Sequence, residues 1–264
     1  MKEKENTTTP KGITQILSEQ INASLHEHRR SRFSLLLSSF AAGLEIGFSL
    51  LIMATVYTMF GDHSSPQFLH IILSISYSFG FILVIIGRSE LFTEHTTLAI
   101  FPVLNKNESI KNLFILWGIV YLGNIVGGCI FAFLSVFLGS EMDMIKPEAF
   151  YELAHKLIDH SGYVILISGI FAGWLMGLLA WLLASVSETI SRIFMIIMVT
   201  TAIGFLGLHH SIVGNIEIFA GYLSSNKISF SAYLIPVLWA TLGNILGGGI
   251  FVALLKFSHV KGAD

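Results

Sequence analysis

Two adjacent histidines, His209 and His210, interrupt a long apolar stretch of the sequence. An imidazole ring titrates near neutral pH, so either side chain could exchange a proton with a small solute. Charged residues also interrupt apolar stretches, at Glu45, Arg88, Glu90 and Glu217. A charge inside a membrane span is costly, so we expect these four side chains to face the protein interior and to pair with one another.

Histidines and carboxylates together could also bind a metal ion in a membrane-embedded enzyme. Metalloproteases carry a His-Glu-x-x-His spacing on one helix face, and the sequence lacks that spacing. It also lacks a serine nucleophile elbow, and its single cysteine, Cys129, cannot form an internal disulfide. We therefore expect no metal and no other cofactor, and a metal-dependent enzyme stays the less favoured alternative.

The composition is typical of an integral membrane protein. Of the 264 residues, 53% are hydrophobic and 12% are charged, whereas soluble domains carry about 25% charged residues. The net charge of −2 offers no basic surface, so we expect no nucleic-acid partner. Residues 1–32 are polar, which predicts a cytoplasmic N-terminal segment with a short helix around 13–25 rather than a signal peptide.

Six apolar runs are long enough to cross a lipid bilayer, which takes about 20 residues. They cover residues 36–60, 67–104, 112–138, 163–186, 193–224 and 231–255. The second and fifth runs are too long for one span, and polar residues interrupt them at 87–95 and 207–215. We predict that each forms two half-helices joined by a loop, which protein or a water-filled cavity must surround because lipid cannot satisfy backbone groups.

The distribution of lysine and arginine predicts the orientation. With Arg88 left aside, the two terminal segments and the loops after the second and fourth runs hold eleven of these residues, and the alternate loops hold three. The positive-inside rule then places both termini in the cytoplasm. We expect a transmembrane domain at 36–257, a cytoplasmic segment at 1–35 and a cytoplasmic tail at 258–264.

The two halves of the chain resemble each other. The run Gly123–Gly128, which contains Asn124, recurs at Gly243–Gly248 with Asn244 in the same place. Close helix packing explains the glycines but not an asparagine at the same position twice. Three spans in each half predict an inverted 3+3 repeat, with the functional site at the interface of the two halves.

Four motifs carry a resemblance to a known family. They are Tyr77–Phe81, Glu90–Thr93, His210–Ile212 and Gly243–Gly249. In order and spacing they resemble the formate/nitrite transporter family, of which this chain looks like a divergent member. The resemblance implies an aquaporin-like fold, a homopentamer in the inner cell membrane with one pore per protomer, and proton-linked permeation of small monovalent anions or their weak acids.

The same resemblance assigns roles to individual residues. It implies that His210 faces Thr93 at the pore centre, with His209 beside it, and that Lys156 lies at the outer vestibule. The residues of the hydrophobic constrictions would be Leu91, Phe81, Tyr77 and Ile203.

Several residues depart from the pattern of that family. His209 stands where an acidic residue is common, and Arg88 stands where a small residue is expected. The four intramembrane charges form either a structural ion-pair lattice or part of the pore lining. In the second case the pore is acid-lined and selects a different solute, so both alternatives stay open.

Overall fold

The computed structural model describes residues 11–262, and the regular structure in this range is helical throughout. The elements in chain order are α1 (Ile13–Arg29), α2 (Arg32–Phe60), α3 (Pro66–Gly87), α4 (Phe92–Leu98), α5 (Phe101–Leu104), α6 (Ile110–Glu141), α7 (Pro147–Ile158), α8 (Gly162–Ser185), α9 (Thr189–Phe205), α10 (Ser211–Ser224), α11 (Phe230–Leu246), the π-helix η1 (Gly247–Leu254) and α12 (Leu255–Lys261).

Five helical segments in the described range are long and apolar enough to cross a membrane. They are Arg32–Phe60, Pro66–Gly87, Ile110–Glu141, Gly162–Ser185 and Phe230–Lys261. The apolar helix α9 has 17 residues and is shorter than a full span. The protein is therefore an all-helical, multi-pass membrane protein.

Local sequence signals explain where the long helices begin. Four of them start after a serine whose side chain accepts a hydrogen bond from the backbone N–H three residues later, which removes one unpaired donor of the first turn. These N-cap serines are Ser31, Ser65, Ser109 and Ser229. Pro66 and Pro147 follow their caps directly, where the missing N–H of proline costs nothing.

Backbone at positive φ lies at both of the interruptions that the sequence predicts inside long apolar runs. After α3, Arg88 adopts a left-handed conformation with φ of 61°, and α4 begins at Phe92. After α9, Gly207 has φ of 62°, and α10 begins at Ser211. Glycine adopts this conformation freely, whereas a residue with a Cβ pays roughly 1–2 kcal/mol.

Two asparagines hold the two interruptions in the same way. The Asn124 side chain accepts from the Phe92 N–H at 2.8 Å and donates to the carbonyls of Ser39 and Glu90 at 2.7 and 2.9 Å. The Asn244 side chain likewise accepts from the Ser211 N–H at 2.8 Å. It donates to the carbonyls of Gly169 and His209, both at 2.9 Å.

Glycines bring the asparagine-bearing helices close to their neighbours. A Cβ on Gly43 of α2 would collide with the backbone of Asn124 on α6, and a Cβ on Gly173 of α8 would collide with the backbone of Asn244 on α11. Each asparagine can therefore reach across a tight helix pair to the interrupted segment beyond it. The close approach and the amide together position residues 90–92 and 209–211.

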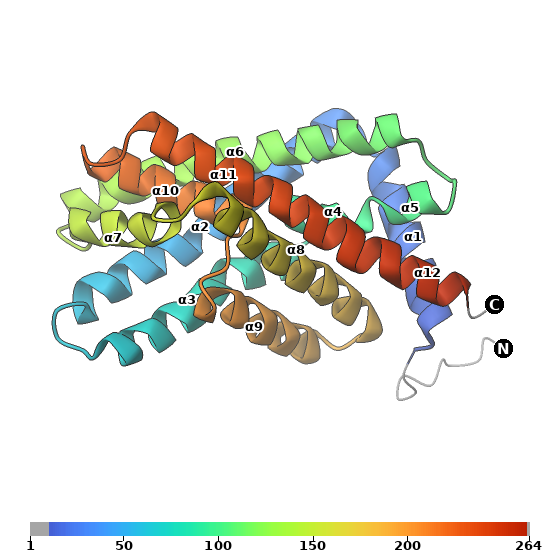
Figure 1. The fold of residues 1–264 in the computed structure, drawn as a ribbon, viewed down its shortest axis with the longest axis horizontal. Helices are drawn as coiled ribbons and strands as arrows, with labels where there is room; N and C mark the ends of the chain where they lie inside the picture. The colour runs from blue at the N-terminus through green and yellow to red at the C-terminus, as the bar shows by residue number, and fades with distance from the viewer. Residues whose placement is uncertain (1–10, 263–264) are drawn as a thin grey trace.

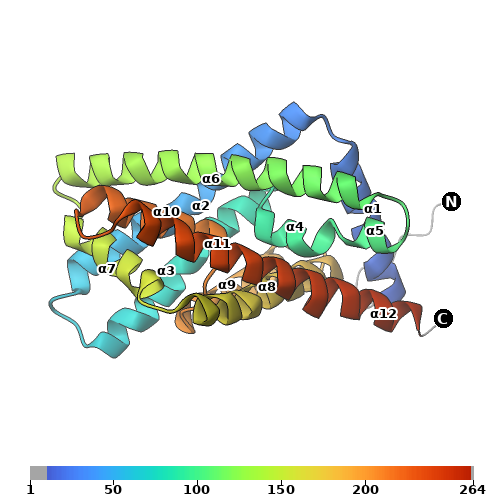
Figure 2. The ribbon, with the colours of Figure 1, turned by 45° about the horizontal axis from the view of Figure 1, so that its top comes forward.

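The described ends of the chain lie at one end of an elongated helix bundle, and α7 lies at the other (Figure 1). In both ribbon views α1 crosses the bundle end at which α5 and α12 lie (Figures 1 and 2). Apolar side chains fix it there, since Ile16, Leu17 and Ile21 pack in one cluster with Phe101 and Trp181. The two described ends are consequently on the same side of the bundle.

Candidate functional site

The two interrupted segments meet at a threonine and a histidine. Thr93 belongs to the first turn of α4, and His210 is the N-cap of α10. The hydroxyl oxygen of Thr93 lies 2.7 Å from Nε2 of His210. Both residues are buried, with exposed fractions of 0% and 2%. The structure thus brings together two residues that are 117 positions apart and that the sequence assigns to one site.

The hydrogen bonds of His210 determine which ring nitrogen carries the proton. Nδ1 accepts a hydrogen bond from the Val213 N–H at 3.3 Å, so the neutral ring carries its hydrogen on Nε2. Nε2 then donates to the Thr93 hydroxyl, whose own hydrogen stays available for another acceptor. The pair therefore presents one hydroxyl donor, which the neutral histidine orients.

Apolar and aromatic side chains surround this pair. The ring of Phe81 meets the His210 ring edge-on at 5.1 Å, and Tyr77 lies 5.3 Å from Phe81. Leu91 and Ile203, the other two residues expected at constrictions, are fully buried. A charged solute in this region would lose its hydration without gaining a fixed counter-charge.

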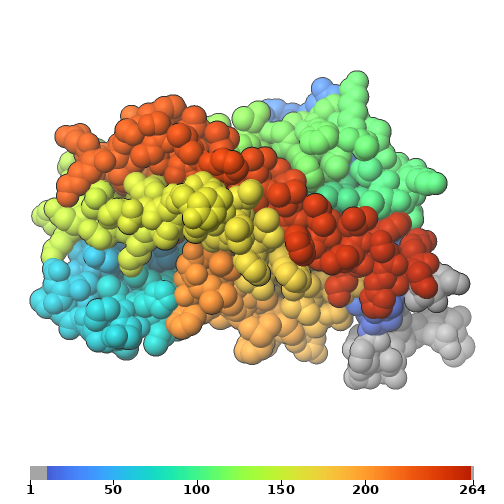
Figure 3. Space-filling view, viewed as in Figure 1, coloured from blue at the N-terminus to red at the C-terminus, as the bar shows by residue number. Residues whose placement is uncertain are grey.

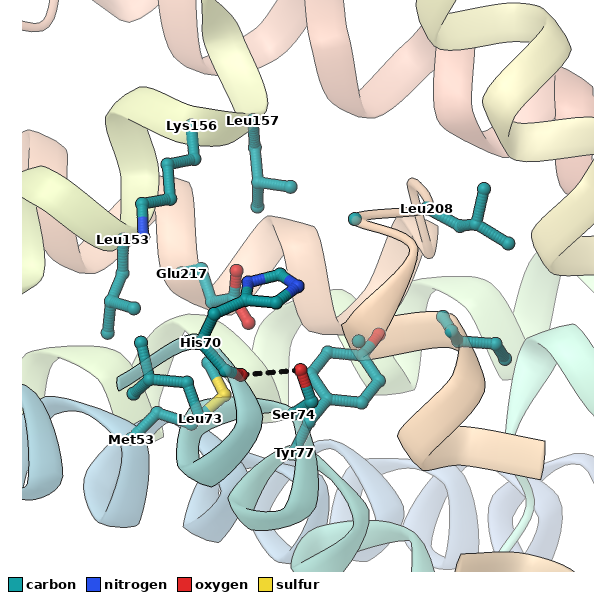
Figure 4. A pocket seen from close by; sticks show the side chains of 13 residues that line it. Met53, His70, Leu73, Ser74, Tyr77, Leu153, Lys156, Leu157, Leu208 and Glu217 are labelled. Carbon is teal, nitrogen blue, oxygen red and sulfur yellow. Dashed lines mark hydrogen bonds between the residues drawn. The ribbon is translucent and has the colours of Figure 1, made fainter. Parts of the chain in front are cut away.

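A cavity of about 120 Å³ lies next to this region (Figure 4). Its lining includes Tyr77 and Ile203 and extends to Lys156 of α7 and Glu217 of α10. The elements that supply the lining, among them α3, α7 and α9, meet on the face seen in Figure 3. We call this space the vestibule cavity. Lys156, which the family resemblance predicts at the outer vestibule, lines this cavity together with the carboxyl group of Glu217.

His209 makes a different set of contacts from its neighbour. Its Nε2 donates to the Leu157 carbonyl at 3.0 Å, and its Nδ1 accepts from the Ser168 hydroxyl at 2.9 Å. Its backbone carbonyl accepts from Asn244. The structure therefore does not bring His209 to Thr93, because both ring nitrogens are occupied by protein groups on α7 and α8.

The expectation that the four intramembrane charges pair with one another is wrong. Glu90 forms ion pairs with Arg30 at 2.5 Å and with His95, and Arg30 also binds Glu27 at 2.7 Å. Arg88, whose backbone is in the left-handed conformation, is exposed. The remaining two carboxyl groups, those of Glu45 and Glu217, each have one buried oxygen without a hydrogen-bond partner in the described chain.

Arg30 and His95 are the partners that sequence reasoning missed. From the sequence, Arg30 is only one of the positive charges of the N-terminal segment, and nothing in the sequence points to a function for His95. The sequence carries no local signal for the pair between Arg30 and Glu90, which are 60 residues apart. The five-residue spacing between Glu90 and His95 spans a helix start, where helical periodicity does not apply. Within residues 11–262, no three His, Cys, Asp or Glu residues gather as a metal site would require.

Comparison with known proteins agrees with this architecture. Residues 14–258 match the model of the family described as formate/nitrite transporter. The inner membrane protein YfdC of Escherichia coli (strain K12) is 31% identical over 255 residues, which cover 90% of this chain and 78% of YfdC.

Two solved structures share the fold. One, described as an FNT family ion channel, has a TM-score of 0.81 at 24% identity and covers 93% of this chain and 99% of its own. The other, described as a pentameric formate channel with formate bound, has a TM-score of 0.70 at 21% identity and covers 87% and 98%. From the family match over most of its length, this chain belongs to the formate/nitrite transporter family and is a membrane transporter, not an enzyme.

Proposed function

We propose that the protein carries a formate- or nitrite-like monovalent anion across the membrane as its neutral acid, through one pore in each protomer. The observation that supports this most directly is the buried contact between Thr93 and His210, with Phe81 against the histidine ring. An anion would be heavily penalised among these side chains, whereas its neutral acid passes an apolar ring far more cheaply.

The order of the residues suits such a path. Lys156 lines the vestibule cavity and attracts an anion toward it. Tyr77 and Ile203 line the same cavity, and Phe81 lies between Tyr77 and His210. In this proposal His210 and Thr93 contact the solute at the pore centre. His209 does not contact the solute. It positions the loop through its hydrogen bonds with the Ser168 hydroxyl and the Leu157 carbonyl.

We further propose that the membrane domain has six spans in an inverted 3+3 repeat. The second span would consist of α3 with α4 and α5, and the fifth of α9 with α10, each interrupted at the positive-φ residue described above. The matching hydrogen bonds of Asn124 and Asn244 support this pairing of the halves. Lysine and arginine are in excess in the terminal segments and in the loops after the second and fourth apolar runs, which supports a cytoplasmic location for both termini.

A homopentamer completes the proposal. A solved structure of the same fold is described as a pentameric formate channel with formate bound. Large apolar side chains, among them Phe133 and Phe137 of α6, are exposed in the single chain. Such faces suit lipid or neighbouring protomers.

The experiment that tests the function is formate uptake into proteoliposomes driven by an acidic outer pH. We expect rapid uptake by the wild type and loss of it in His210→Asn, which removes the titratable group and keeps a similar shape. His63→Asn, an exposed histidine in the loop between α2 and α3, is the matched control and should keep wild-type uptake. Wild-type protein that is folded and pentameric but carries no formate would refute the proposal.

A further inference from the structure

Glu217 has a buried carboxyl group with one oxygen that forms no hydrogen bond to the described residues. It is 5% exposed and lines the vestibule cavity from α10. Its Oε1 atom is fully buried and has no hydrogen-bond partner in residues 11–262. Burying a carboxylate without a partner is costly, so a carboxyl group in this position must hold a proton or meet a cation.

The polar groups around Glu217 come from two helices. Lys156 on α7 lines the same cavity but forms no ion pair with Glu217 within 4.0 Å. On α3, His70 binds the Phe205 carbonyl at 2.8 Å, and Ser74 donates to the His70 carbonyl at 2.7 Å (Figure 4). The Nε2 atom of His70 and the Ser74 hydroxyl are therefore occupied by backbone groups.

The rest of the lining offers little to the carboxyl group. The remaining titratable group from α3 is the Tyr77 phenol, while α2 and α9 contribute the apolar Met53 and Ile203. A solute in the cavity would thus find an ammonium group on one wall and an unsatisfied carboxyl group on another. This arrangement suits a small anion that is held by Lys156 while one of its oxygens faces Glu217.

We propose that Glu217 is the proton-exchange group of the vestibule cavity, which converts a weak-acid anion held by Lys156 into the neutral acid that enters the apolar pore. The O–H bond of the Glu217 carboxylic acid breaks, and an O–H bond forms on the anion. Glu217 is left as a carboxylate opposite the Lys156 ammonium, and a proton from water at the open mouth of the cavity restores it. The solute class is therefore a small oxyanion of a weak acid.

This inference rests on the proposed function and adds one requirement to it. Without Glu217 the pore can accept only acid that is already neutral in solution. At low outer pH such acid is abundant, so the carboxyl group is dispensable. At high outer pH it is scarce, and transport depends on Glu217. A residue with a merely structural role would change uptake equally at both pH values.

The test compares Glu217→Gln with the wild type in proteoliposomes at outer pH values of about 5 and about 8. We expect the variant to lose at least about tenfold in formate uptake at the higher pH, as for removal of a general acid, and to stay within about twofold at the lower pH. Glu217→Asp should restore the wild-type pH profile. Glu148→Gln, an exposed carboxyl group on α7, is the matched control and should change neither value.

Glu217→Met keeps the test decisive if the glutamine variant does not assemble, because methionine leaves no unsatisfied polar atom. The methionine variant should show the pH profile that is expected for Glu217→Gln. The inference would be overturned by an equal loss of uptake at both pH values or by no loss at either. It would also be overturned by a gain in uptake, which would indicate that the carboxylate only repels the anion. Absence of wild-type uptake would instead refute the proposed function. The two failures are therefore distinguishable.

Discussion

Replacing Asn124 by leucine should destabilise the protein through one identifiable set of bonds. The side chain is fully buried and makes three hydrogen bonds of 2.7 to 2.9 Å, two of them to backbone groups of residues 90 and 92. Leucine has a similar volume and fills the space without replacing any of them. The Phe92 N–H and the Glu90 carbonyl would then be left unpaired in the interior.

The magnitude follows from the number of bonds. Hydrogen bonds between helices contribute about 0.6–1.5 kcal/mol each, so the loss of three should cost roughly 2–4 kcal/mol of unfolding free energy. Asn124→Asp with a protonated carboxyl group keeps the acceptor for the Phe92 N–H and supplies one O–H donor in place of the two N–H donors. It should therefore destabilise the protein less than leucine at a pH where that carboxyl group is protonated.

Chemical unfolding of purified protein in detergent measures this difference. Asn112→Leu, on the exposed face of the same helix, is the control and should change the unfolding free energy by less than about 1 kcal/mol. Formate uptake should also fall in Asn124→Leu, because Thr93 directly follows the released Phe92. If Asn124→Leu is as stable as Asn112→Leu, the amide does not hold the interrupted segment and the argument is refuted.

Two further substitutions test other parts of the fold. Arg30→Ala removes the cation bound to Glu90 and should loosen the junction of α1, with faster amide hydrogen exchange in α1 and about 1–3 kcal/mol of lost stability because the pair is only partly exposed. Unchanged exchange would show that the apolar contacts of α1 suffice. Gly43→Ala should sharply reduce the yield of folded protein, since the new Cβ meets the backbone of Asn124, whereas Gly118→Ala, with open space around its Cβ, should fold normally. Equal yields of the two variants in detergent extracts would contradict the close-packing argument.

The sequence alone determined the class of the protein and its family. Long apolar runs predict membrane helices from the composition of about 20 neighbouring residues, and the described structure is helical, with five segments long and apolar enough to cross a membrane. The motifs at 77–81, 90–93, 210–212 and 243–249 identified the family, which the family match confirms. The count of six spans and the roles of the pore residues stay predictions.

Only the tertiary structure decided how the buried charges are satisfied. The sequence shows that Glu90 and Glu217 interrupt apolar runs, but it predicted one cluster with Arg88, and the structure separates them. Glu90 pairs with Arg30 from the N-terminal helix, whereas Glu217 lines a cavity and has one oxygen without a partner in residues 11–262. Arg88 itself is exposed. Such partners depend on how distant segments pack and on the local turn, and neither leaves a periodic signal in the sequence.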